Sequence, residues 1–289
     1  MILGRTKHGV SLRRGLAVAM MLAALPGAVS ASPAQTFYER SFVMAAGARC
    51  NLFDARLTAA LNAATLQARG AALRAGASDI DLAATRARAH ARAHATPCGS
   101  ADLNVVRGRV EAGFAGWRRT RSMTFPGQRG DWSADRAAYS RTTWRLMQAT
   151  STGASPVRFG VAGGIEQPDV LTAVVSWYGR PRPTGARIVL RDPTIAARPW
   201  LSGTTPPAPQ TRVIWAAANQ AAPSGLLAVG RADGQAWTFP AAAAQALAGL
   251  DPREVFAVEF VFRDGSVARS QFEAGDFPAA RAFVAMGPV

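Results

Sequence analysis

Two histidines one helical turn apart are the closest approach to a metal-binding pattern in this sequence. His90 and His94 would both reach one ion if residues 79–95 form a helix. A metal site requires further ligands, but this segment contains no glutamate, and Arg88 and Arg92 would repel a cation. We therefore predict solvated helix residues at these positions and no metal site.

The constellations used by hydrolytic enzymes are missing. Residues 121–289 contain no histidine, so a Ser-His-Asp triad cannot be built within them, and the G-x-S-x-G elbow is absent. Cys50 and Cys98 are the only cysteines. In an exported protein such a pair is expected to form one disulfide, which would remove both thiols as nucleophiles and stabilise the fold by about 3–4 kcal/mol. Two buried free thiols are the alternative.

Paired carboxylates are the remaining route to catalysis. Most acidic residues of the second half stand in Asp-Pro, Asp-Gly or helix-start contexts, where aspartate serves turns and caps. We therefore predict no catalytic residue and no cofactor, and keep as the alternative an envelope enzyme with carboxylates in a cleft between two domains. Its candidates would be Asp192, Asp251, Glu254, Asp264, Glu273 and Asp276.

Arginines beside aromatic residues are the candidate binding groups, because a guanidinium stacks on a ring and receives anions. Two clusters have this composition: Trp117, Arg118, Arg119 and Arg121, and Trp177, Tyr178, Arg180 and Arg182. Trp200 is a further candidate, in the proline-rich segment 198–210 that we expect to be a long exposed loop. Glycan stacking is one interpretation of these aromatic residues, and packing in the core is the other.

The positive charge is concentrated in the first half. Residues 32–150 hold 17 arginines against 8 acidic residues, and residues 151–289 hold 12 against 10. This excess predicts an anionic partner, for which we expect an envelope protein or an anionic envelope polymer. Nucleic acid is not expected, because no zinc finger, RNA-binding signature or phosphate-binding loop is present. The biased composition of a GC-rich genome is the alternative origin of the arginines.

Residues 1–31 have the pattern of a cleavable signal peptide. Basic residues precede an apolar run at 16–25, and Val29-Ser30-Ala31 places small residues before a cleavage site. The run is about half as long as a bilayer span. We expect a periplasmic or secreted protein without a membrane span after cleavage, and Arg13-Arg14 leaves both the general and the twin-arginine export routes open. An uncleaved anchor is the alternative.

The segment 36–120 is predicted to be a helical domain. The spacing of apolar residues and the capping residues predict four helices. The first covers 37–46, the second is capped by Asp54 and ends at 74, the third covers 79–95 after Ser78, and the fourth follows Ser100. We expect Ile80 and the alanines that follow it at helical spacing to form the buried side of 79–95. The helices at 54–74 and 79–95 should form an antiparallel pair, which would bring the two cysteines together.

The segment 121–289 is predicted to be β-rich, because short alternating runs are split there by glycine and proline. Asp264-Gly265 and Asp233-Gly234 predict hairpin turns, and Pro240 and Asp276 predict the starts of two short helices. The expected strands are 142–147, 157–161, 170–177, 187–190, 212–216, 226–229, 236–239, 255–262 and 267–272. We therefore expect an α+β fold: a disulfide-stapled helical N-terminal unit, followed by a mostly antiparallel β-sandwich-like domain with two short helices.

Two C-terminal segments, 237–247 and 272–283, each predict a strand leading into a short alanine-rich helix. In this respect the C-terminal part resembles the invasion-associated locus B family of exported alphaproteobacterial proteins. The resemblance covers under a tenth of the chain and implies an exported, β-rich protein without catalytic activity. It transfers no site residue, and the helical part has no counterpart in that family.

Together these features predict a non-enzymatic exported protein that binds a partner or polymer in the cell envelope. The carboxylate enzyme is one alternative function. A structural accessory subunit of an envelope complex is the other.

Overall fold

Four helices occupy the N-terminal part of the computed structural model, which describes residues 31–164, 167–179 and 182–289, and only the backbone of 167–168. The predicted signal peptide lies outside the described residues, apart from Ala31. The helices are α1 (Pro33–Cys50), α2 (Ala55–Arg74), α3 (Asp79–Ala95) and α4 (Ala101–Arg119). The change from helix to strand falls between Arg119 and Ser122.

Local capping determines where these helices begin. The Asp54 carboxylate accepts a hydrogen bond from the Leu57 N–H at 2.7 Å, and Ser78 forms the predicted capping box with Asp81. Ser100 caps α4 in the same way. Helix α1 is longer than the predicted 37–46, because Ser32 caps it and Pro33 takes its first position.

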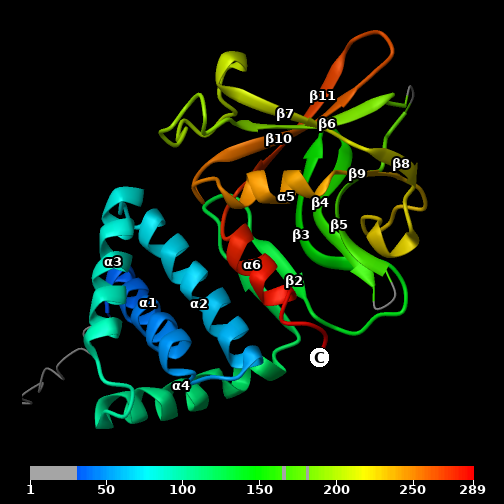
Figure 1. Cartoon of the computed structure of the whole chain (residues 1–289). Helices are drawn as coiled ribbons and strands as arrows, with labels where there is room; N and C mark the ends of the chain where they lie inside the picture. The colour runs from blue at the N-terminus through cyan, green and yellow to red at the C-terminus, as the bar shows by residue number, and fades with distance from the viewer. Residues whose placement is uncertain (1–30, 165–166, 180–181) are drawn as a thin grey trace, which may run out of the picture. The chain divides into compact units, whose positions relative to one another are not determined.

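The predicted antiparallel pairing of α2 with α3 is wrong as the main helix contact. Helix α1 packs more extensively against both than they pack against each other (Figure 1). The fully buried Phe37 ring of α1 joins a core cluster with residues of α2 and with Leu82 of α3. Helices α1 and α3 run parallel, since Arg86 covers Phe37 and Arg92 covers Phe42. Their C-terminal ends therefore meet, and the predicted Cys50–Cys98 disulfide joins them.

The predicted buried side of α3 is also wrong. Ile80 is 81% exposed, whereas Leu82, Thr85, Ala89 and Ala93 are buried. Alanines follow more than one face of this helix, so their spacing does not distinguish the faces. Leu82 determines which face is buried, because it is the side chain that packs against Phe37 of α1.

Eleven strands, all paired antiparallel, form two sheets in the described residues and confirm the α+β prediction. The seven-stranded sheet contains, in spatial order, β1 (Ser122–Phe125), β2 (Trp132–Asp135), β3 (Thr143–Thr152), β4 (Ser155–Gly164), β5 (Gln167–Val175), β9 (Gln235–Thr238) and β8 (Ala218–Ala221). The four-stranded sheet contains β11 (Val267–Glu273), β10 (Val255–Val261), β6 (Gly185–Arg191) and β7 (Thr211–Trp215).

The short strands β1, β2 and β8 were not predicted from the sequence, and one expected strand is wrong. Residues 226–229 begin with the last residue of a 3₁₀ turn (Ser224–Leu226) and form no strand, and Leu226 covers the seven-stranded sheet beside Val174 and Ala236. Their apolar character therefore reflects packing on a sheet face. Asp233-Gly234 also does not form a tight hairpin, because residues 222–234 connect β8 to β9. The turn at Asp264-Gly265 is confirmed, with Gly265 at φ +82° between β10 and β11.

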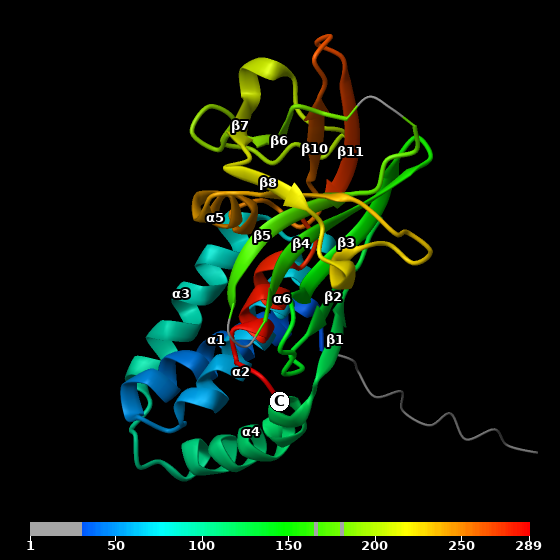
Figure 2. The same cartoon turned by 90° about the vertical axis from the view of Figure 1, so that its right-hand side faces the viewer.

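One core lies between the sheets and the short helices α5 (Ala241–Ala248) and α6 (Phe277–Val284), both at the predicted positions. Phe159 of β4 is at its centre, with its ring 5.2 Å from Phe256 and 5.4 Å from Phe272 of the other sheet. Figures 1 and 2 show α6 between α2 and the seven-stranded sheet. The helical layer is therefore attached to the β part through α6.

Gly70 of α2 permits the close approach of α2 to α6. A Cβ atom at this position would lie 1.9 Å from Oδ1 of Asp276, the residue that precedes α6. One turn further along α2, Arg74 pairs with the same carboxylate. Within the described part of the chain, no helix has the length and apolar character needed to cross a membrane.

Candidate functional site

The six carboxylates considered for catalysis include two in surface turns. Asp192 accepts hydrogen bonds from the Thr194 hydroxyl and N–H, and Asp264 accepts the equivalent pair from Ser266. These hydrogen bonds lower the pKa of both aspartates. Both residues are therefore turn-forming aspartates, as their sequence contexts indicate.

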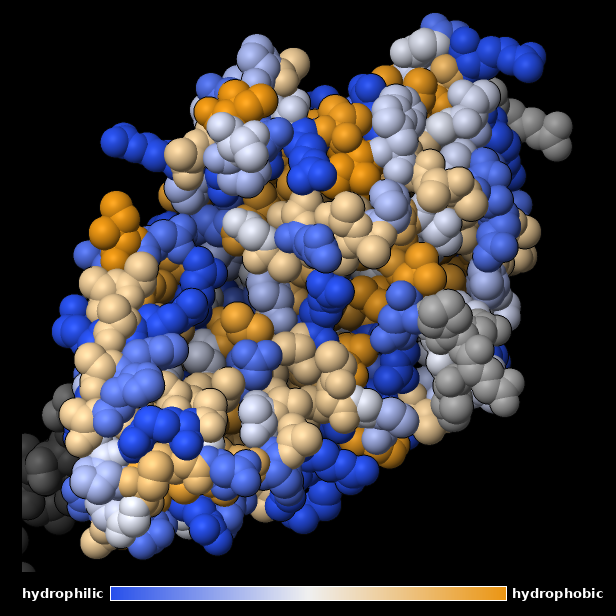
Figure 3. Space-filling view, in the orientation of Figure 1, coloured by the Kyte–Doolittle hydropathy of each residue, from blue (hydrophilic) through white to orange (hydrophobic). Residues whose placement is uncertain are grey.

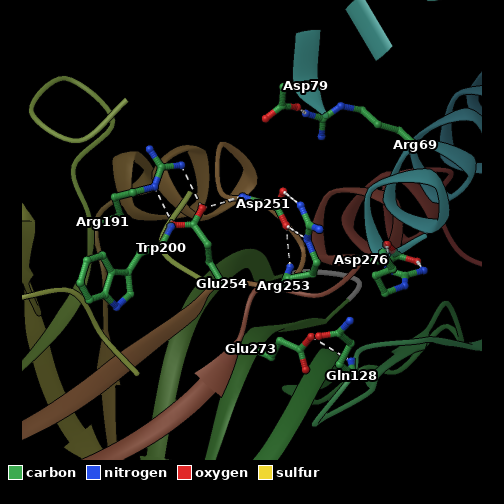
Figure 4. A network of polar contacts seen from close by, with 11 residues as sticks. Arg69, Asp79, Gln128, Arg191, Trp200, Asp251, Arg253, Glu254, Glu273 and Asp276 are labelled. Carbon is green, nitrogen blue, oxygen red and sulfur yellow. Dashed lines mark hydrogen bonds and ion pairs between the residues drawn. The ribbon is translucent and has the colours of Figure 1, made fainter. Parts of the chain in front are cut away.

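Asp251 and Glu254 are buried in a polar network shown in Figure 4. Arg253 holds Asp251 through two hydrogen bonds of 2.9 Å. Arg191 holds Glu254 in the same bidentate way at 2.6 and 2.9 Å, and the backbone N–H groups of Asp251 and Trp200 also donate to Glu254. Each of these carboxylates thus has a guanidinium as its counter-ion.

Glu273 and Asp276 are equally buried. The backbone N–H groups of residues 128–130 all donate to Glu273, with Gln128 at 2.8 Å. Arg74 holds Asp276 at 2.6 and 2.9 Å. Burial raises the pKa of Asp276, and Arg74 opposes that rise.

All four buried carboxylates therefore have their oxygens engaged by arginines or backbone donors. A general acid or base has to exchange its proton with a substrate, which requires an accessible oxygen. Figure 4 shows these contacts as separate groups: Glu254 and Asp251 with their arginines, Asp276 with its partner from α2, and Glu273 with Gln128. These contacts favour a structural role for the four residues.

The structure does not bring the first arginine–aromatic cluster together as one site. Trp117 is half-buried and packs edge-on against Phe283 at 6.2 Å. Arg118 points to Asp54 of α2, at 3.5 Å. Arg121 stacks on the Tyr139 ring and also lies near Asp135, while Arg119 is exposed. The aromatic member of the cluster is thus a packing residue.

The second cluster is partly assembled. Trp177 packs against the rings of Phe260 and Phe262, at 5.3 and 5.4 Å. Tyr178 is 60% exposed, and Arg231 lies 4.0 Å above its ring. Arg182 pairs with Asp233 at 3.3 Å, and Arg180 lies outside the described residues. Arg231, which was not among the residues predicted from the sequence, is therefore the cation that stacks on Tyr178.

Trp200 is half-buried and is not an exposed contact residue of its loop. Its backbone N–H donates to Glu254 at 3.0 Å, and its ring N–H is buried without an acceptor among the described residues. The same loop continues into Thr205–Ala208, and these residues form one wall of a groove. This groove is therefore a better candidate for a binding site than Trp200 itself.

The outer groove, as we name it, lies on the face of the four-stranded sheet that points away from the core. Its volume is about 510 Å³. Pro206 and Pro207 form part of its wall, and Val189 and Val213 part of its floor. Figure 3 shows apolar surface interrupted by strongly hydrophilic side chains over β6, β7 and β10. Val213 and the neighbouring Trp215 are 43% and 51% exposed.

One row of side chains crosses all four strands at this groove. The register places Arg269 opposite Glu259, Glu259 opposite Arg187, and Arg187 opposite Trp215. Glu259 is buried and accepts from Arg187 at 2.7 Å and from Arg269 at 2.8 Å. The Arg187 guanidinium lies 5.2 Å from the centre of the Trp215 ring. Two guanidinium groups share one carboxylate, so the row carries a net positive charge and keeps unused N–H donors.

The groove also borders a strand edge that pairs with no other strand among the residues the structure describes. Strand β7 is the last strand of its sheet, and the hydrogen bond from the Ala216 N–H to the Ala186 carbonyl shows which of its residues face β6. Because antiparallel pairs alternate, Val213 and Trp215 direct their N–H and C=O groups away from β6. A further strand could pair with these groups.

None of the residues of this row was among the candidates predicted from the sequence. Glu259 is the only acidic residue in an otherwise apolar strand. Phe256, Val258 and Phe260 share one face of that strand, so the alternation places Glu259 on the face that points away from the core. Trp215 stands in the predicted strand 212–216. The cross-strand partners Arg187 and Arg269 depend on strand order, which no local signal reveals.

Comparison with known proteins leaves the chain without a match among protein-family models, curated proteins and solved structures. The similarity to the invasion-associated locus B family stays a prediction. The two segments that carry it are the end of β9 followed by α5, and the end of β11 followed by α6.

Proposed function

We propose that this is an exported, non-enzymatic protein that binds an acidic, extended segment of another envelope protein in the outer groove. The observation that carries the proposal is the row in which Arg187 and Arg269 share Glu259 beside the exposed Trp215. The signal-peptide pattern of residues 1–31 and the disulfide support an oxidising compartment outside the cytoplasm.

Charge favours an anionic ligand. Arg269 is 51% exposed and Arg187 31%, so each keeps N–H groups that face the groove in addition to those bound to Glu259. A carboxylate of the partner would accept from these donors in the charge-assisted geometry that guanidinium groups favour. Trp215 and Val213 would contact the apolar side chains that alternate with acidic ones along a strand.

The free edge of β7 favours a peptide over a polysaccharide. The outward N–H and C=O groups of Val213 and Trp215 have the spacing that an added strand matches, and a sugar chain does not repeat that spacing. A polysaccharide would be held by the arginines and Trp215 alone.

The test uses residues 32–289 and a fluorescent peptide that alternates valine with glutamate. We expect saturable binding by anisotropy that weakens with added salt. The same peptide with glutamine in place of glutamate should bind much more weakly. An oligogalacturonate of equal charge tests the polysaccharide alternative.

Three variants locate the binding. Arg269→Gln removes one groove cation, Trp215→Ala removes the exposed ring, and Val213→Pro removes an outward N–H that β6 does not use. Each should weaken peptide binding by about tenfold. Arg119→Gln on α4 is the matched control for charge and should bind as the wild type. Equal loss in Arg119→Gln, or tighter binding of the oligogalacturonate than of the peptide, would overturn the proposal.

A further inference from the structure

Two adjoining cavities open at one end of the core, between the seven-stranded sheet and the helices α5 and α6. Their volumes are about 350 and 330 Å³, and Asp169, Val284 and Ala285 line both. The size of the larger one falls within the usual range of small-molecule sites. Around α5 and α6, Figure 3 shows hydrophobic surface flanked by hydrophilic residues.

The two cavities differ in chemistry. The larger has an apolar wall that includes Leu146, Val161, Phe239 and Val284, each buried in the core, with the exposed Arg281 at its rim. The smaller is lined by Arg145 together with Gly287 and Pro288 near the C-terminus. An occupant of both would therefore need an apolar part and an anionic part.

Arg145 is a buried cation without a carboxylate partner in the described part of the chain. It is 8% exposed, and one of its nitrogens donates to the Ala137 carbonyl. It is the extra residue of a β-bulge in β3, since the pairing shifts between Trp144 and Leu146. Bulges redirect a side chain out of the regular alternation of a strand, and they are frequent beside functional sites. This one places Arg145 in the cavity.

Asp169 is an exposed residue at the junction of the two cavities, and it also forms no ion pair within the described residues. Its carboxylate rests on Gly163, where a Cβ atom would lie 2.3 Å from Oδ1. The charge of Arg145 acts on Asp169 and opposes the rise in its pKa that burial causes. The two groups are nevertheless too far apart to form a salt bridge directly.

We propose that the adjoining cavities bind a free amino acid with an apolar side chain. Its carboxylate would lie at Arg145, its ammonium group at Asp169 and its side chain against the apolar wall of the larger cavity. A simple organic anion would leave Asp169 unmatched and close to a like charge. This site is separate from the outer groove and does not depend on the proposed function.

Titration calorimetry on residues 32–289 tests the proposal with three probes. L-Phenylalanine carries both charges, 3-phenylpropionate lacks the ammonium group and phenethylamine lacks the carboxylate. We expect phenylalanine to bind at least about tenfold more tightly than either analogue, because each analogue leaves one charged group of the protein unpaired.

Variants at the rim avoid disturbing the core. Asp169→Asn should weaken phenylalanine binding by about tenfold and should not weaken phenylpropionate binding, because the substitution also removes a like charge from beside that anion. Ala285→Trp should abolish phenylalanine binding by filling the junction, whereas Trp215→Ala in the outer groove should bind as the wild type. Equal binding of phenylalanine and phenylpropionate, no effect of Asp169→Asn, or no binding of phenylalanine to the wild type would each overturn the proposal.

Discussion

Arginine is the counter-ion of most buried carboxylates in this protein. Asp251, Glu254, Glu259 and Asp276 each accept from at least one guanidinium group, and Glu273 is held by backbone N–H groups instead. Removing one member of a buried ion pair costs far more than an exposed pair is worth, because the remaining charge stays desolvated. The arginine-rich composition therefore has a structural use, whatever its genomic origin.

Arg74→Ala should destabilise the protein by about 3–5 kcal/mol at neutral pH, because Asp276 is left buried without its counter-ion. Burial already raises the pKa of Asp276, and loss of Arg74 raises it further. A carboxyl pKa that is higher in the folded state means that protonation favours folding. The free energy of unfolding that Arg74→Ala loses relative to the wild type should therefore become smaller as the pH falls. Urea unfolding at neutral and mildly acidic pH measures this.

Arg107→Ala is the control for Arg74→Ala, because Arg107 forms an exposed i,i+4 pair with Glu111. It should lose only about 0.3–0.5 kcal/mol. If the stability that Arg74→Ala loses relative to the wild type stayed constant or grew as the pH fell, the role given to Asp276 would be contradicted.

Gly70→Ala should destabilise the protein, although alanine is the better helix former by about 1 kcal/mol. The new Cβ would lie 1.9 Å from Oδ1 of Asp276 and would push α2 away from α6. Gly108→Ala in α4 is the matched control, because a Cβ there meets open space and should stabilise the helix. Thermal unfolding of the two variants should shift in opposite directions, and a stabilised Gly70→Ala protein would refute the close contact.

Among the elements, α1 has the largest effect on the arrangement of the helical layer. It packs along α2 and α3, and its C-terminal residue Cys50 is bonded to Cys98 beyond α3. The buried faces of all three helices are formed largely by small side chains, which permit close packing. Phe37 is the large side chain that fills the space among them.

Leu82→Ala and Ile80→Ala form a matched test of which face of α3 is buried. Leu82 is 2% exposed, and its truncation should cost about 2–5 kcal/mol. Ile80 is 81% exposed, and its truncation should change stability by less than about 0.5 kcal/mol. If Ile80→Ala lost more stability in chemical unfolding than Leu82→Ala, the buried face would be the one predicted from the alanine spacing.

Replacing both cysteines with serine tests the link between α1 and α3. The bond closes a loop with a sequence separation of 48, so its loss should cost about 3–4 kcal/mol through the entropy of the unfolded chain. Comparison of the unfolding midpoints of Cys50→Ser/Cys98→Ser and the oxidised wild type measures this. Equal midpoints would mean that the bond is not formed in the wild-type protein.

At the scale of the whole molecule, the described chain from Ser32 onward forms one compact unit. Its helical and β parts are joined by the packing of α2 against α6 and by the buried Arg74–Asp276 pair. The outer groove and the cavities beside Arg145 lie on different elements, one on the four-stranded sheet and one beneath α5 and α6. The two proposed sites are therefore open to independent mutation.

Export with cleavage after Ala31 should yield a mature protein that begins at Ser32. N-terminal sequencing of the protein recovered from the periplasmic or extracellular fraction checks this. Ala31→Leu should block cleavage and leave the longer precursor, because signal peptidases require a small residue at that position. An unprocessed wild-type chain retained in the cytoplasm would rule out export.

The sequence by itself was sufficient for features that depend on neighbouring residues. Asp54, Ser78 and Ser100 indicated the starts of helices, and Asp264-Gly265 the tight turn between the last two strands, because caps and turns are satisfied within a few residues. The α+β class and the Cys50–Cys98 pair followed from periodicity and from the small number of cysteines.

Features that depend on distant contacts were decided only by the tertiary structure. The buried face of α3 depends on Phe37 of α1, and the pairing of Glu259 with Arg187 and Arg269 depends on the order of β11, β10 and β6. The aromatic residues of the predicted clusters could equally pack or bind, and the hydrophobic effect buried Trp117 and Trp177 partly in the core, where their apolar area is removed from water. It left Trp215 exposed on an edge strand, where a binding surface can form.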